Sequence, residues 1–184
     1  MSTITVNIAD FTVAVHCLYD FTEKYCRDYL GDGDTDFSVS VLGQKVKFDY
    51  AYIVQHGAPG ETGQLQGYLE MLKIPFSSCG SYSSMIAFNK YACKSYVRTL
   101  VRCAPDLLVR QGDDLEAFCA KAVRKLKFPV FVKPTQGGSS FGVTRVAEAS
   151  ELISAIQFAL TEGPMVLVEQ GVTGRELTCA ACFD

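Results

Sequence analysis

The stretch FPVFVKPTQGGSSFGVTRV, residues 128–146, decides the expected fold. It predicts a strand that carries one lysine, a break at Pro134, a flexible loop, and a second strand that begins near Phe141. Because side chains alternate across a strand, Lys133 shares a face with Phe131. Lys133 is therefore expected to point toward whatever the hairpin covers.

The loop between these two strands has the composition of an anion-binding loop. Gly137 and Gly138 can take positive φ and leave their backbone N–H groups unshielded, and Ser139 and Ser140 add hydroxyl donors. With Lys133 at its base, such a loop would clamp a polyphosphate. An ordinary hairpin with a surface lysine is the alternative that this stretch alone leaves open.

Composition predicts a globular protein with one large or two small domains. The chain has 184 residues, 48% of them hydrophobic, and a net charge of −3 without a basic stripe, so nucleic acid is not an expected partner. No apolar run approaches the roughly 20 residues of a membrane span, and no signal-peptide pattern opens the chain. We therefore expect a cytoplasmic protein with no membrane partner.

The cysteines predict neither disulfides nor a metal site. The chain has eight, and they are dispersed along it. Only Cys179 and Cys182 form a C-x-x-C motif, in LTCAACF, and on the strand predicted there they would lie on opposite faces. Reduced, unpaired thiols are expected.

Hydrophobic periodicity predicts the remaining elements. One amphipathic helix is expected within residues 1–36 and a hairpin after residue 37 that turns at Gly43 and Gln44. A buried strand over 48–55 would deliver His56 at its end. Helices are expected from about residue 65 to before Pro75, over 82–100, over 114–125 and from an N-cap at Ser150, followed by a strand over 165–170.

Several phrases, taken together, carry a resemblance. H-G-x-x-G-E-x-G-x-x-Q-G-x-L-E spans residues 56–70 and is followed by IPFSSCG at 74–80, FNKYACK at 88–94, the lysine-and-loop phrase at 133–140 and VLVEQGVTGRE at 166–176. In this order they resemble the D-alanine:D-alanine ligases of the ATP-grasp fold, from about residue 37 to the end. Two departures are Thr62 and Asn89, where aspartate is usual. Threonine is still expected to cap the following helix.

The resemblance implies an α/β fold in which a preATP-grasp domain precedes a partial ATP-grasp domain, its first subdomain only. The implied boundaries are 37–88 for the preATP-grasp substrate domain and 89–184 for the first ATP-grasp subdomain. Residues 1–36 stay unassigned. The implied activity is ATP- and Mg²⁺-dependent ligation of two D-alanines through an acyl phosphate, for peptidoglycan synthesis.

The resemblance also implies roles for individual residues. His56 and Glu61 would position the first D-alanine, and Ser139 would be catalytic. Nucleotide contacts are implied for both phosphate-binding lysines, for the loop and for the strand that leads into the hinge: Lys90, Lys133, Gly137, Gly138, Ser139, Ser140, Glu169, Gln170, Val172 and Glu176.

Two family features have no match. The early G-G-x-S-x-E phrase is absent, and the metal ligands are expected beyond Asp184, so this chain alone is expected not to turn over. A non-catalytic nucleotide-binding remnant and another ATP-grasp ligase, such as a D-alanine:D-lactate ligase, remain open. Nothing in the sequence fixes the oligomeric state, although the family is commonly dimeric.

Overall fold

The computed structural model describes residues 38–41, 44–47 and 49–177. The chain forms two compact units that divide between Met85 and Ile86. The predicted helix within residues 1–36 and the strand predicted around Cys179 and Cys182 lie outside the described residues.

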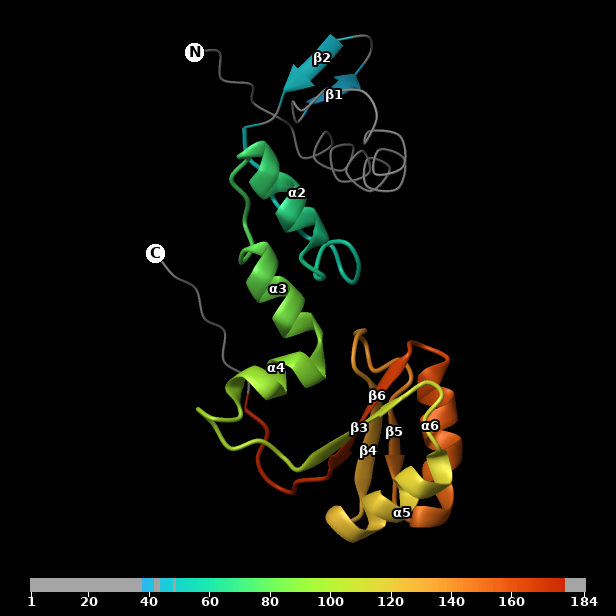
Figure 1. Ribbon diagram of the computed structural model, residues 1–184. Coiled ribbons are helices and arrows are strands. Elements are labelled where there is room, and N and C mark those ends of the chain that lie inside the picture. Colours follow the sequence, from blue (N-terminus) through green and yellow to red (C-terminus); the bar gives the residue numbers. More distant parts are fainter. Residues whose placement is uncertain (1–37, 42–43, 48, 178–184) are drawn as a thin grey trace. The chain divides into compact units, whose positions relative to one another are not determined.

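The second unit contains a four-stranded antiparallel sheet with the strand order β3-β6-β4-β5 (Figure 1). Its strands are β3 (Asp106–Arg110), β4 (Val130–Pro134), β5 (Thr144–Val146) and β6 (Met165–Gln170). The predicted strands β4 and β6 are confirmed. Strand β5 begins at Thr144 and not near Phe141, because the chain turns at Gly142 (φ 67°) before pairing starts. Strand β3 was not predicted.

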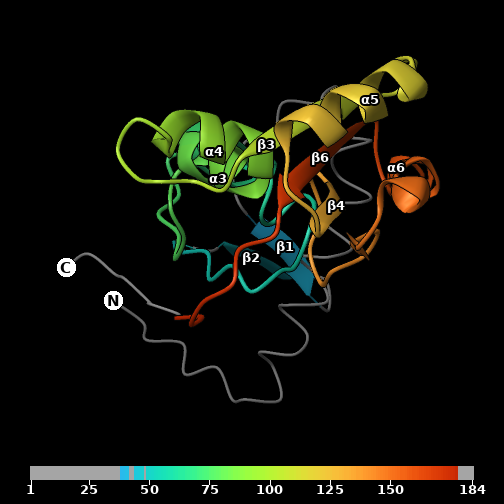
Figure 2. The ribbon, with the colours of Figure 1, turned by 90° about the horizontal axis from the view of Figure 1, so that it is seen from below.

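One face of this sheet is apolar and packs on two helices, α5 (Leu115–Lys125) and α6 (Leu152–Leu160) (Figure 2). Val130 and Val132 of β4 and Val166 and Val168 of β6 are fully buried there. The alternation predicted for β4 is confirmed, since Phe131 and Lys133 are only partly buried. Lys133 therefore lies on the face away from α5 and α6.

Both helices follow the predicted periodicity, but only α5 begins as expected. Asp114 caps α5 by accepting a hydrogen bond from the Ala117 N–H (3.0 Å). The buried stripe of α6 is confirmed, whereas the predicted N-cap at Ser150 is wrong. Ser150 lies inside a 3-10 turn, η1 (Ala149–Glu151), which moves the start of the helical segment back toward Glu148.

The helix expected over residues 82–100 is two helices, α3 (Ser81–Phe88) and α4 (Lys90–Val97). Asn89 separates them with an extended backbone (φ −91°, ψ 106°). Its side-chain oxygen accepts hydrogen bonds from the N–H groups of Tyr91 (3.1 Å) and Ala92 (3.0 Å). Asparagine competes with the helical backbone in this way, so it ends one helix and starts the next.

We expect Asn89→Ala to lower the free energy of unfolding by about 1 kcal/mol, because two N–H groups of α4 lose their acceptor. Asn89→Asp keeps the acceptor and should cost little. Urea unfolding measures both. An equal loss in the two variants would mean that the cap does not stabilise α4.

The first unit contains the predicted hairpin, β1 (Ser38–Val41) and β2 (Gln44–Lys47), and the predicted helix, α2 (Gln64–Leu72). Gln44 belongs to β2 and not to the turn. Leu65 and Leu69 of α2 are buried in a small core with Ala51.

The buried strand predicted over residues 48–55 is wrong in its described part. Ala51 forms a single parallel bridge with Phe76, and its N–H and C=O bond to Pro75 and Ser77. Tyr52 and Val54 are more than half exposed. The apolar residues of this stretch belong to an extended segment that buries only one of its faces. The hydrophobic pattern alone cannot distinguish such a segment from a buried strand.

Gly142 is a position where the backbone requires glycine. Its φ is 67°, and a Cβ there would lie 2.8 Å from side-chain carbons of both Pro134 and Glu162. We expect Gly142→Ala to destabilise the fold by about 1–2 kcal/mol, measured by urea unfolding. Gly138, whose Cβ would meet nothing within 4 Å, is the matched control.

Candidate nucleotide-binding site

The sheet face away from α5 and α6 carries a chain of alternating charges. Asp106 of β3 and Glu169 of β6 are directly opposite each other across the two strands. Two carboxylates in this register repel each other unless a cation lies between them. Lys94 of α4 is that cation, with its Nζ 2.5 Å from Asp106 Oδ2 and 2.5 Å from Glu169 Oε1.

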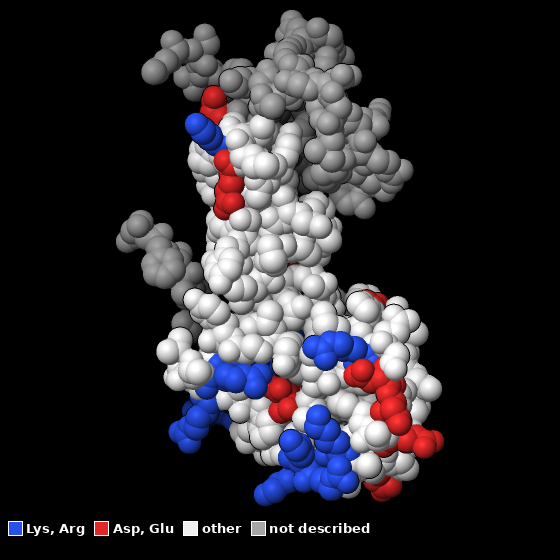
Figure 3. Space-filling view, viewed as in Figure 1, with Lys and Arg blue, Asp and Glu red and all other residues white. Residues whose placement is uncertain are grey.

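Lys133 extends the chain of charges, because its Nζ contacts the other oxygen of Glu169, Oε2. At the opposite end, Arg98 lies 3.6 Å from Asp106. Basic and acidic side chains adjoin each other on the visible surface of this unit (Figure 3). The structure therefore brings together two predicted site residues, Lys133 and Glu169, and ties them to Lys94.

Sequence reasoning missed Lys94 and Asp106. Lys94 follows Lys90 by four residues, which places both on one side of α4. That spacing was the available signal for Lys94. Asp106 had none, because β3 itself was not predicted.

The ion pairs shift two pKa values. Burial alone would raise the pKa of Glu169, but hydrogen bonds from Lys133 and Lys94 outweigh it and lower this pKa. Burial alone would lower the pKa of Lys94, but its bonds to Asp106 and Glu169 raise it. Both shifts favour the charged forms that make up the network.

These shifts predict how stability depends on pH. Because the pKa of Glu169 is lower in the folded state, its contribution is present above the ordinary glutamate pKa of about 4.3 and is lost as pH falls through the folded pKa. Glu169→Gln should flatten the acid side of the stability profile, measured by urea unfolding from pH 7 downward. The exposed Glu162→Gln is the control, and equal profiles for the two variants would contradict the prediction. Because the pKa of Lys94 is raised, its contribution is fully present below the ordinary lysine pKa and is lost only in alkali, as pH rises through the folded-state pKa.

Lys90, the other lysine predicted to bind phosphate, contacts the glycine-serine loop. Its Nζ donates to the Gly137 carbonyl (2.9 Å), and its backbone N–H donates to the Thr135 carbonyl (2.8 Å). Burial and the charge of Lys133 lower the pKa of Lys90. The ammonium groups of Lys90 and Lys133 are therefore close enough to repel each other, and that of Lys90 contacts the loop.

The loop itself differs from the prediction in one respect. Gly137 has positive φ (114°), but Gly138 does not, and the other left-handed residues are Ser139 (φ 50°) and Ser140 (φ 59°). All four are exposed. Serine in this conformation is strained, which is a feature of ligand-binding loops when the surrounding structure holds it.

The hinge residues lie in different surroundings. The Gln170 side-chain oxygen accepts a hydrogen bond from the Lys127 N–H (2.9 Å), so Gln170 ties β6 to the end of α5. Val172 is 74% exposed, and Glu176 is exposed. Of the predicted hinge contacts, only Glu169 lies in the charged network.

His56 and Glu61 belong to the first unit. His56 is exposed. Glu61 closes its own loop, because its carboxylate accepts from the Gly57 N–H (2.6 Å) and its N–H donates to the Gly57 carbonyl (2.7 Å). Among the described hydrogen bonds, none joins the side chains of His56 and Glu61.

The rest of this phrase holds the loop in place. The predicted capping by Thr62 is wrong, because Gly63 is the N-cap of α2 and Thr62 instead bonds to Pro59 and Gln64. Gln66, which the sequence analysis did not single out, is buried and donates to the Gly60 carbonyl (2.6 Å). Glu70 accepts from the backbone and hydroxyl of Ser81 at the start of α3, which lowers its pKa.

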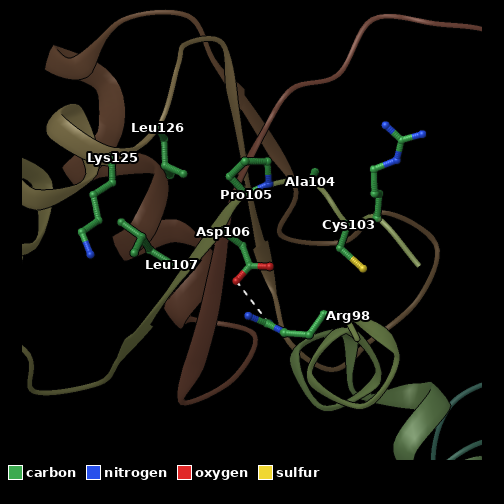
Figure 4. Close-up of a pocket in the computed structure, with 9 residues that line it drawn as sticks. Arg98, Cys103, Ala104, Pro105, Asp106, Leu107, Lys125 and Leu126 are labelled. Carbon is green, nitrogen blue, oxygen red and sulfur yellow. Dashed lines mark ion pairs between the residues drawn. The ribbon is translucent and has the colours of Figure 1, made fainter. Parts of the chain in front are cut away.

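A pocket of about 580 Å³ opens beside the charged network of the second unit, at Arg98 and Asp106. Figure 4 shows Arg98 directed toward Asp106 at its wall, with Cys103 and Lys125 at other sides. It contains none of the predicted site residues. Because Arg98, Arg102 and Lys125 line it, this pocket is a competing location for an anion.

The described residues do not supply a metal site. No group of three or more His, Cys, Asp or Glu side chains among them is arranged to hold an ion. Asp106 and Glu169 share Lys94, which leaves their oxygens engaged. The cysteines within the described residues, Cys79, Cys93, Cys103 and Cys119, are unpaired, and burial raises the pKa of Cys119.

Comparison with known proteins gives consistent matches. A family model described as D-ala D-ala ligase C-terminus matches residues 104–183. The D-alanine–D-alanine ligase of Azobacteroides pseudotrichonymphae is 46% identical over 145 residues, which cover 78% of this chain and 44% of that protein. The chain thus spans less than half the length of this relative.

Solved structures agree. D-alanyl-alanine synthetase A from Vibrio cholerae matches with a TM-score of 0.68 and 30% identity, over 76% of this chain and 43% of that one. The VanG D-Ala:D-Ser ligase from Enterococcus faecalis matches with a TM-score of 0.67 and 30% identity, over 74% and 43%.

The sheet and these neighbours define the class of fold as ATP-grasp, in a mixed α/β protein, as predicted. Within that class, the chain belongs to the D-alanine–D-alanine ligase family over the part that it shares with these relatives. The predicted resemblance is confirmed. Among the described residues, no helix is both long and apolar enough to cross a membrane.

Proposed function

We propose that residues 86–177 bind the phosphates of ATP, as part of a ligase that joins two D-alanines for peptidoglycan synthesis. The observation that carries this proposal is that Lys90 contacts the strained loop at residues 137–140 and feels the charge of Lys133 nearby. Two ammonium groups beside exposed backbone N–H groups form a site for a polyanion.

The residue roles follow the same logic. Lys90 and Lys133 hold phosphate oxygens, and Gly137, Gly138 and Ser140 cover them. Ser139 lies nearest the transferred phosphoryl group as the proposed catalytic residue.

At the hinge, Glu169, Gln170 and Val172 face adenine, and Glu176 binds the ribose. In the first unit, His56 and Glu61 position the first D-alanine. We further propose that 37–88 is the preATP-grasp domain and 89–184 the first ATP-grasp subdomain.

The chemistry explains why cations are required. Transfer of a phosphoryl group to the carboxylate of D-alanine brings two anions together, and the charge that develops must be neutralised in place. Lys90 and Lys133 supply two positive charges at one loop. Among the described residues, no cluster of His, Cys, Asp or Glu side chains fits Mg²⁺.

Nucleotide affinity tests the phosphate assignment. We expect affinity to fall in the order ATP, ADP, AMP when each is titrated into the chain by calorimetry, because each lost phosphate removes charge-assisted contacts. Lys90→Met should weaken ATP more than AMP. Equal affinity for ATP and AMP would contradict phosphate binding by this loop.

Two alternative functions are separated by product analysis. The structural match to the VanG D-Ala:D-Ser ligase means that the fold alone does not identify the second substrate. Incubation with ATP, Mg²⁺ and D-alanine, with D-serine or D-lactate added, would distinguish the dipeptide from the mixed products. ATP binding without any product is the result expected for a non-catalytic nucleotide-binding protein.

A further inference from the structure

Lys133 is not free in this structure, because it forms an ion pair with Glu169. A lysine that binds phosphate must leave its carboxylate when the ligand arrives. Leaving a partly buried carboxylate without a counter-ion is costly. Glu169 therefore needs a second cation that stays in place.

We propose that Lys94 is the permanent counter-ion of Glu169 and thereby releases Lys133 to bind phosphate. This makes Lys94 a positioning residue that acts through Glu169 without touching the ligand. The inference rests on the proposed function, in which Lys133 binds phosphate.

The two lysines contact different oxygens of Glu169. Lys94 holds Oε1 at 2.5 Å, whereas Lys133 holds Oε2. When Lys133 departs, the contact of Lys94 is unchanged. The carboxylate therefore keeps one charged partner in both states.

Lys94 is fixed, and Lys133 is not. The Lys94 ammonium has three donors, and it has three acceptors: the Ala104 carbonyl (2.8 Å), Asp106 (2.5 Å) and Glu169 (2.5 Å). Its side chain is 14% exposed, against 22% for Lys133, for which the structure describes the contact with Glu169. Moving Lys94 would break three charge-assisted or backbone bonds, and moving Lys133 would break one.

The position of Lys90 indicates where the released Lys133 would bind an anion. Lys90 already lies at the loop with its Nζ on the Gly137 carbonyl, and the charge of Lys133 acts on it and, after burial, lowers its pKa. Without an anion, the two ammonium groups repel each other, so Lys133 pairs with Glu169. An anionic ligand between them turns this repulsion into shared attraction.

A double-mutant cycle tests the proposal, with inorganic triphosphate as the probe because it has no adenine to contact Glu169. Lys94→Met should weaken triphosphate binding roughly tenfold or more, since Glu169 then holds Lys133 alone. Glu169→Gln should tighten binding. The combined variant should recover at least most of the affinity that Lys94→Met lost, because Lys133 is again released.

The contrary results are distinct. If Lys94 only supports the fold, the combined variant binds as weakly as Lys94→Met or more weakly, which would overturn the proposal. Lys94→Arg keeps the charge and should bind nearly as the unmodified chain does. Circular dichroism and urea unfolding on every variant show whether it is folded, and the comparison uses the variants that are.

Failure of the proposed function gives a different pattern. If the unmodified chain does not bind triphosphate, or if Lys133→Ala binds it equally well, the phosphate assignment is wrong. If Lys133→Ala abolishes binding while Lys94→Met leaves it unchanged, only the counter-ion role of Lys94 is wrong.

Discussion

Lys133→Ala is expected to weaken ATP binding by roughly tenfold to a hundredfold, because a charge-assisted hydrogen bond contributes roughly 1.5–3 kcal/mol. The side chain lies on the sheet face away from the helices, so its truncation leaves the apolar core intact. It also leaves Glu169 paired with Lys94. The loss should therefore appear in affinity more than in stability.

Lys121→Ala is the matched control for this variant. Lys121 is an exposed lysine of α5, the helix on the opposite face of the sheet. Calorimetry with ATP should give it the affinity of the unmodified chain. Equal affinities for Lys133→Ala and Lys121→Ala would show that Lys133 does not bind phosphate.

The largest effect on stability is expected from Ile156→Ala, which should lower the free energy of unfolding by about 2–5 kcal/mol. Ile156 is fully buried between α6 and the sheet that carries Lys133 and Glu169. Its truncation removes apolar contacts and leaves a cavity that the surrounding strands fill only partly.

Phe158→Ala removes a larger side chain from the same helix and tests whether burial decides the effect. Phe158 is 54% exposed. Its truncation should therefore cost less than the truncation of Ile156, despite the greater volume removed. Urea unfolding compares them, and the reverse order would mean that α6 does not pack as the structure shows.

The sequence predicted those elements in which pattern and packing agree. β4 buries every second residue, and α6 buries one face at helical spacing, so the hydrophobic periodicity was sufficient to predict both elements. It was insufficient where one side chain decides the local structure. Asn89 divides a continuous helical pattern by capping α4, and Gly142 delays β5.

The residues of the candidate site were predicted one by one from the sequence, and their binding roles stay predictions, whereas their arrangement could not be predicted. Lys90 came from one recognisable phrase and Lys133 with the loop from another, and the structure places Lys90 on the Gly137 carbonyl and within reach of the charge of Lys133. The pairing of Lys133 with Glu169 depends on the register of β4 against β6. The register of β3 against β6 places Asp106 opposite Glu169, and Lys94 lies between these two carboxylates. Register joins residues far apart in the chain, such as Asp106 and Glu169, so a local motif does not show which residues will be paired.

The most direct test of phosphate binding is an amide NMR titration of the ¹⁵N-labelled chain with a non-hydrolysable ATP analogue. The account predicts that the largest shifts occur at Gly137, Gly138, Ser139 and Ser140 and that adenosine alone leaves these amides unchanged. Shifts centred instead on the pocket at Arg98 and Cys103, with the loop unaffected, would contradict it.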